Sequence, residues 1–153
     1  MRIHLREGAE PFAIHTPRQI PLAYQDAVRQ ELDSMEAQGI IAPVDDVPSP
    51  WCHPLVAVPK PQGGVRITTD LSKLNGQVSR PAHPSPTPFA AIRSVTPEAR
   101  FFTTIDALHG YWQLELAEED QHLTTFITPY GRYKIQAWPH GLYSDRRRLL
   151  PLH

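Results

Sequence analysis

Proline constrains this chain more than any other residue type. The 153 residues include 17 prolines, roughly twice the usual share, and many of them fall within 43–61 and 81–97. Proline has no backbone N–H to donate and its φ is fixed, so these two segments are expected to be connections rather than helix interiors. No long helix is therefore expected within them.

The segment 21–38 is predicted to be a helix. Four apolar residues recur there at helical spacing and fall near one face, namely Leu22, Val28, Leu32 and Met35. Pro21 suits a first helical turn, and Gly39 suits the position just after a helix end. This is the longest helix that the sequence indicates.

Two β-hairpins are predicted. The first pairs 55–58 with 65–69 across Gly63-Gly64, where glycine adopts a positive φ at little cost. The second pairs 124–128 with 132–137 across a Pro-Tyr-Gly turn. A short helix at 88–95 and strands at 101–105 and 113–116 complete the expected elements. One helix with segregated hairpins indicates an α+β fold.

Charge is balanced overall but unevenly distributed. The net charge is −1, yet 60–80 and 132–148 carry a positive excess, whereas 26–46 and 115–120 carry a negative excess. Separated basic and acidic faces would suit a ligand that bears phosphate. Ordinary solvated surface charge would give the same pattern, so both interpretations stay open.

The chain is expected to be intracellular, in the cytoplasm or nucleus. Cys52 is its one cysteine, so no disulfide can form within the chain. No apolar run is long enough for a transmembrane helix, and the first ten residues lack the apolar core of a secretory signal. No membrane partner is expected.

One carboxylate, Asp106, lies inside the apolar and aromatic run 101–114. An aspartate between a strand and a tight turn often accepts hydrogen bonds from backbone N–H groups two residues on. It is also the kind of oxygen ligand that Mg²⁺ takes, together with substrate phosphates. One aspartate cannot build a two-metal site, and the residues alone leave both interpretations open.

Seven short motifs occur in a fixed order. They are Gly-Ile-Ile at 39–41, Ser-Pro-Trp at 49–51, Val-Pro-Lys at 58–60, Gly-Gly-Val-Arg at 63–66, Asp-Leu-x-x-Leu-Asn at 70–75, Asp-x-x-x-Gly-Tyr at 106–111 and Pro-x-Gly-Leu at 139–142. In this order and spacing the chain resembles the reverse transcriptase of gypsy-type LTR retrotransposons over residues 1–142. The resemblance implies an α+β fold, the incomplete fingers and partial palm of a right-hand polymerase.

The resemblance also implies a division of the chain. It comprises an extended N-terminal arm at 1–20, a fingers-like region at 21–100, a partial palm at 101–142, and a basic tail at 143–153 that departs from the family pattern.

Site residues follow from the resemblance. Asp106 matches the first catalytic aspartate, a Mg²⁺ ligand, and Ala107 and Leu108 match residues whose amides approach the triphosphate. Tyr111 matches the aromatic residue under the nucleotide sugar, although a core tyrosine would look the same. His140 lies in the loop that matches the region near the templating base.

Basic residues of the first hairpin complete the expected site. Arg66 matches the fingers arginine that binds the incoming triphosphate, for which a guanidinium offers a suitable fork of donors. Without the resemblance, an exposed arginine on a polar hairpin face would be the ordinary interpretation. Lys60 matches a second basic position near the phosphates. Asp70 and Asn75 match positions with turn and cap roles.

The implied partners are an RNA or DNA template-primer and deoxynucleoside triphosphates. The family pattern stops near Leu142, and no adjacent pair of aspartates follows Asp106. We therefore expect a truncated copy that is inactive alone, and that needs the missing palm and thumb regions or a partner chain.

Two other hypotheses remain. One is a non-catalytic module that binds single-stranded nucleic acid through Arg66, Lys73, Tyr130 and Trp138. The other is a non-functional translated relic.

Overall fold

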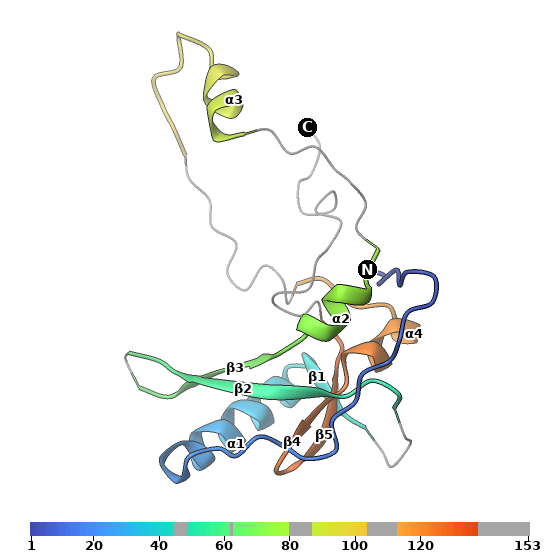
Figure 1. Cartoon of the computed structure of the whole chain (residues 1–153). Helices are drawn as coiled ribbons and strands as arrows, with labels where there is room; N and C mark the ends of the chain where they lie inside the picture. Colours follow the sequence, from blue (N-terminus) through green and yellow to red (C-terminus); the bar gives the residue numbers. More distant parts are fainter. Residues whose placement is uncertain (45–48, 62, 80–86, 104–112, 138–153) are drawn as a thin grey trace.

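A five-stranded sheet forms the centre of the computed structural model, which describes residues 1–44, 49–61, 63–79, 87–103 and 113–137 (Figure 1). The elements are α1 (Leu22–Ala37), β1 (Ile41–Pro43), β2 (His53–Pro59), β3 (Val65–Thr69), α2 (Ser72–Gln77), α3 (Pro88–Arg93), α4 (Glu118–Gln121), the 3-10 helix η1 (His122–Thr124), β4 (Phe126–Thr128) and β5 (Gly131–Ile135). The mixture of helices with a largely antiparallel sheet confirms the predicted α+β class.

The predicted helix at 21–38 is confirmed as α1. It buries Val28, Leu32 and Met35 on one face. Gly39 ends the helix with φ of 69°, a conformation that favours glycine. Its N–H donates to the Glu36 carbonyl at 2.9 Å, and the Ile40 N–H donates to the Met35 carbonyl at 2.9 Å. These two bonds satisfy carbonyls at the helix end and turn the chain into β1.

Both predicted hairpins are confirmed. In the first, β2 and β3 pair antiparallel with Val58 opposite Arg66. The turn closes through the Lys60 N–H, which donates to the Gly64 carbonyl at 3.0 Å. In the second, β4 and β5 pair antiparallel with Thr128 opposite Gly131.

The strand order is β1-β5-β4-β2-β3, so the two hairpins lie side by side. β2 and β4 join them through a short parallel pairing, with His53 opposite Phe126 and Pro54 opposite Ile127. β1 adds to β5 at one edge, and β3 forms the other edge.

Two apolar clusters hold the elements together. The first lies between α1 and the sheet and includes Leu32, Ile41 and Phe126, each at most 1% exposed. The second joins the N-terminal arm to α2 and to the residues around α4; its buried members are Ile3, Trp51, Leu71, Leu74, Val78, Leu116 and Leu123. Burial of apolar surface at both places stabilises the fold by roughly 25 cal/mol per Å².

The first twenty residues form no helix and lie along the second cluster. Leu5 forms an isolated bridge with Val78, and Ala13 forms one with Cys52. The backbone N–H of Ile3 donates to the Asp120 carboxylate at 2.8 Å. The arm is therefore packed against residues from three later parts of the chain.

The predicted strand at 101–105 is not formed over its described residues. Residues 101–103 have no strand partner there, and the side chains of Phe101 and Phe102 are 94% and 75% exposed. A strand needs a neighbouring backbone for its hydrogen bonds, and propensity alone does not supply one. Thr104 and Ile105 lie outside the described residues.

The predicted strand at 113–116 is also wrong. It is reduced to one isolated bridge between Glu115 and Ala137. The predicted short helix at 88–95 is confirmed as α3, whose Phe89 and Ile92 are exposed. No helix in the described part of the chain is long and apolar enough to cross a membrane.

Candidate functional site

The β2–β3 hairpin presents Arg66 on an open face at the edge of the sheet. Its neighbours Val65 and Ile67 are 2% and 7% exposed, and they fix β3 against the first apolar cluster. Alternation then directs Arg66 to the opposite face, where its cross-strand neighbour Val58 is also exposed. Among the described residues, no carboxylate lies within ion-pair distance of the Arg66 guanidinium. The described residues therefore leave the Arg66 side chain exposed and without an ion-pair partner.

Lys60 lies at the turn end of the same hairpin, as predicted. Its Nζ is 3.9 Å from Oε1 of Glu31 on α1, at the outer limit of an ion pair. The lysine side chain is half exposed, so this pair contributes little to stability. The hairpin thus brings the two predicted cations onto one element, with a carboxylate beside Lys60 and none described beside Arg66.

Asp70 holds the base of the hairpin. Its Oδ1 accepts hydrogen bonds from the Ser72 backbone N–H at 3.2 Å and from the Ser72 hydroxyl at 2.7 Å. Its Oδ2 pairs with the Arg18 guanidinium at 3.2 Å. The bonds from Ser72 are the main reason that the pKa of Asp70 is lowered, and Arg18 adds to the effect.

The expected turn chemistry at Asp70 is confirmed by its bonds from Ser72. The N-cap position of α2 is Leu71, without a side-chain cap hydrogen bond. At Asn75, the backbone N–H donates to the Leu71 carbonyl at 2.8 Å within this short helix.

The remaining predicted site residues lie outside the described residues. They are Asp106, Ala107, Leu108, Tyr111 and His140. Their assignments, including Asp106 as a Mg²⁺ ligand, stay predictions. Within the described ranges, no group of three or more His, Cys, Asp or Glu side chains is arranged to hold a metal ion.

The residues proposed for single-strand binding are largely engaged in other contacts. The Tyr130 hydroxyl donates to the Gln25 carbonyl at 3.1 Å, and the Arg29 guanidinium lies 5.6 Å from the Tyr130 ring centre. The Lys73 ammonium lies 5.7 Å from the ring centre of Phe12. Trp138 lies outside the described residues. Arg66 is the member of this set that is exposed and unpaired within the described part of the chain.

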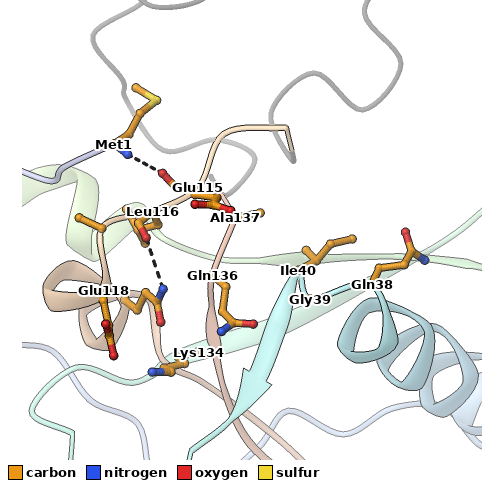
Figure 2. A pocket seen from close by; sticks show the side chains of 12 residues that line it. Met1, Gln38, Gly39, Ile40, Glu115, Leu116, Glu118, Lys134, Gln136 and Ala137 are labelled. Carbon is orange, nitrogen blue, oxygen red and sulfur yellow. Dashed lines mark hydrogen bonds between the residues drawn. The ribbon is translucent and has the colours of Figure 1, made fainter.

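A polar groove that the sequence did not predict lies elsewhere on the molecule. It encloses about 640 Å³ between the end of α1, residues 115–118 and the end of β5. Figure 2 shows Glu118 and Lys134 on one side and Gln38 on the other, with Gln136 between them. Neither Lys60 nor Arg66 lines it.

Two buried polar residues were also missed. His53 is fully buried and Asp120 is 8% exposed. Asp120 belongs to an acidic run that is typical of a solvated surface, and no local pattern distinguishes it from its neighbours. Its role depends on the arm, more than a hundred residues earlier in the chain.

Comparison with known proteins was made by sequence and by structure. No family model matches the chain. The Pol polyproteins of the Drosophila melanogaster transposons opus and gypsy are each 32% identical to it over 127 residues, which is 80% and 79% of this chain. The Gag-Pol polyprotein of woolly monkey sarcoma virus is 29% identical over 128 residues. The chain spans about 12% of the length of each transposon polyprotein and 7% of the viral one.

Solved structures match the fold over nearly the whole chain. The protease-reverse transcriptase of prototype foamy virus aligns with a TM-score of 0.75 and 21% identity, covering 93% of this chain and 19% of that protein. The foamy viral enzyme in complex with an RNA/DNA hybrid aligns with a TM-score of 0.72 and 20% identity, over 90% of this chain and 18% of that protein. The incomplete polymerase-like α+β fold is therefore confirmed. The homologues of this chain are Pol polyproteins of retrotransposons and retroviruses, which it matches over a segment of about 130 residues.

Proposed function

We propose that the chain is a segment of a gypsy-type reverse transcriptase, an RNA-directed DNA polymerase, and that its β2–β3 hairpin binds the triphosphate of the incoming nucleotide. The observation that carries the proposal is the exposed Arg66 guanidinium, which has no described counter-ion and stands on an edge hairpin of a polymerase-like fold. The similarity to the gypsy polyprotein supports the assignment to that group.

The chemistry of the hairpin suits a triphosphate. A guanidinium donates two parallel hydrogen bonds to phosphate oxygens, and such charge-assisted bonds are stronger than neutral ones. Lys60 adds a second positive charge on the same hairpin, and its weak contact with Glu31 leaves it available. The buried Val65 and Ile67 keep the arginine on a rigid strand, which reduces the ordering that binding requires.

The other half of the proposed site rests on the sequence resemblance. Asp106 would hold Mg²⁺, the backbone amides of Ala107 and Leu108 would face the phosphates, Tyr111 would lie under the sugar, and His140 would lie near the templating base. When bound, Mg²⁺ supplies neutralisation of negative charge on the phosphate oxygens. Carboxylate oxygen is the ligand type that this hard cation prefers.

The proposed partners are a template-primer of RNA or DNA and deoxynucleoside triphosphates. Structural neighbours include foamy viral reverse transcriptase bound to double-stranded DNA and to an RNA/DNA hybrid. This chain matches under a quarter of those proteins, so template-directed synthesis is proposed for the longer protein of which it is a segment.

Nucleotide binding by the full 153-residue chain tests the proposal. We expect Arg66→Ala to weaken binding of a deoxynucleoside triphosphate in the presence of Mg²⁺ by roughly ten- to a hundredfold, because hydrogen bonds to charged groups contribute about 1.5–3 kcal/mol. Titration calorimetry at low salt measures the affinity.

Arg100→Ala is the matched control, since Arg100 is also exposed and its loss changes net charge equally. Equal weakening by both variants would show that only net charge matters, and would remove the hairpin from the site. No measurable binding by the unmodified chain would also count against the proposal.

A further inference from the structure

His53 occupies an unusual position for a histidine. It begins β2, is fully buried, and its backbone N–H donates to the Thr125 carbonyl at 2.8 Å. Its Nε2 lies 3.1 Å from the Leu123 carbonyl oxygen. Because a carbonyl can only accept, Nε2 carries the proton and Nδ1 is left as an acceptor. Nδ1 is buried and has no partner among the described residues.

The N-terminal arm covers this imidazole. The ring of Phe12, from the arm, is 6.1 Å from the His53 ring, and the ring of Trp51 is 6.0 Å away and stacked on it. The arm is hydrogen-bonded at the residue before the histidine. The Cys52 N–H donates to the Phe12 carbonyl at 2.9 Å, and the Ile14 N–H donates to the Cys52 carbonyl at 3.0 Å.

The strand β2 pairs with its neighbours over very different lengths. On one side, β2 forms a ladder of five residue pairs with β3, and on the other it pairs with β4. The arm is attached there by one isolated bridge, between Ala13 and Cys52. Displacing residues 12–14 from β2 breaks the two backbone hydrogen bonds at Cys52, whereas displacing β3 would break a ladder of five residue pairs.

Burial lowers the pKa of His53, and two neighbouring groups act in the opposite direction. Asp70, at the end of β3, favours the protonated imidazole through its negative charge, and the hydrogen bond to Leu123 does the same. The Lys73 ammonium of α2 lies over the Phe12 ring, 5.7 Å from the ring centre. Cys52 directly precedes His53, and its thiol is neutral because burial raises the pKa of that thiol. His122 of η1 is exposed. Burial is the largest effect and lowers the pKa of His53.

We propose that His53 is a pH-sensitive contact for the arm, and that its protonation releases residues 12–14 from β2. The imidazolium has two N–H donors, and the second, on Nδ1, has no acceptor in the closed state. A buried charge with an unsatisfied donor is costly, and water can reach Nδ1 once Phe12 has moved away. Protonation therefore favours the open arm over the closed one.

The expected pH range follows from the sign of the pKa difference. The pKa of His53 is lower in the closed state than in the open state, so the closed arm has its full stability at neutral pH and loses stability as the pH falls below about 6.5. For each pH unit below that value, the ratio of closed to open arm falls by up to about tenfold, until the pKa of the closed state is reached. The Arg18–Asp70 contact persists through this range, because the pKa of Asp70 is lowered.

Hydrogen–deuterium exchange of the full chain at pH 7.5 and pH 5.5 tests the inference. After correction for the intrinsic exchange rates, we expect the Ile14 and Cys52 amides to lose protection by up to about tenfold at the lower pH, whereas amides of α1 keep theirs. His53→Gln should abolish this pH dependence, since a glutamine amide can donate to the Leu123 carbonyl and does not titrate. His15→Gln is the control, because His15 is an exposed histidine on the arm.

The pH titration of the His53 ring resonances in the unmodified chain provides an independent measurement, should the glutamine variant not fold. A midpoint below that of the exposed histidines, coinciding with loss of Ile14 protection, supports the inference. A midpoint at or above that of the exposed histidines overturns it. So does an unchanged pH dependence of Ile14 and Cys52 exchange in His53→Gln.

Discussion

Asp70 joins three parts of the chain through one carboxylate. It accepts two hydrogen bonds from Ser72 at the start of α2, it pairs with Arg18 of the arm, and its own N–H donates to the Pro54 carbonyl in β2 at 3.0 Å. A side chain that accepts from the backbone N–H two residues on satisfies a donor at a helix start. The same residue therefore sets where β3 ends and where α2 begins.

Replacement of this carboxylate should destabilise the fold at neutral pH. We expect Asp70→Ala to lower the free energy of unfolding by about 1 kcal/mol at pH 7, because the hydrogen bonds from Ser72 are lost. Because the pKa of Asp70 is lowered by folding, its contribution is present above about pH 3.8 and is lost as the pH falls through the folded pKa.

Urea unfolding at pH 7 and near pH 3 measures the difference between the variant and the unmodified chain, which should shrink in acid. Asp26→Ala, at an exposed position of α1, is the control and should change stability by less than about 0.5 kcal/mol. Equal effects of the two substitutions would contradict a stabilising role for the Asp70–Ser72 hydrogen bonds.

At the scale of elements, replacing either of two glycines with alanine should change the stability of the fold, in opposite directions. Gly39 has φ of 69° at the end of α1, where a β-carbon is strained, so Gly39→Ala should destabilise the fold by about 1 kcal/mol. Gly76 lies inside α2 without a positive φ, and a β-carbon there meets no atom within 4 Å. Gly76→Ala should stabilise by about 0.4–1 kcal/mol.

Thermal unfolding of both variants checks this pair. The unmodified chain should melt between them. A stabilising Gly39→Ala would mean that α1 does not end in the left-handed conformation described above.

Elements with a local signal were predictable, and those that depend on a distant partner were not. α1 follows from its apolar spacing and Gly39, and the β2–β3 hairpin follows from alternation around Gly63 and Gly64. The residues at 101–105 favour a strand, but residues 101–103, the described part, have no neighbouring strand to pair with. Local pattern cannot reveal whether such a neighbour exists.

The same reason limits what could be predicted of the candidate site. Arg66 was placed correctly on the open hairpin face because alternation along a strand is local. The contact of Lys60 with Glu31, the burial of His53 and the role of Asp120 all require knowledge of how α1, β4 and the arm pack. Those contacts join residues far apart in the sequence.

At the scale of the whole molecule, the parallel pairing of β2 with β4 brings the two hairpins into one sheet. The chain leaves β2 and returns at β4 after more than sixty residues, which include β3, α2 and α3. The N-terminal arm contacts two later parts of the chain. Leu5 pairs with Val78, directly after α2, and the Ile3 N–H donates to the Asp120 carboxylate in α4. The β2–β3 hairpin is joined to β4 through β2, and the arm bonds to Cys52 directly before β2.

The last prediction concerns this 153-residue chain assayed alone with a primed template, deoxynucleotides and Mg²⁺. We expect no primer extension, because nucleotidyl transfer relies on carboxylates that hold two metal ions, and no adjacent aspartate pair follows Asp106. The adjacent pair Asp45-Asp46 precedes it by sixty residues, in a proline-rich connection. Gel analysis of a labelled primer measures the product, with a complete reverse transcriptase as the positive control. Mg²⁺-dependent extension by the purified monomer would show that the chain carries its own second metal ligand, and the proposal of an incomplete polymerase site would then fail.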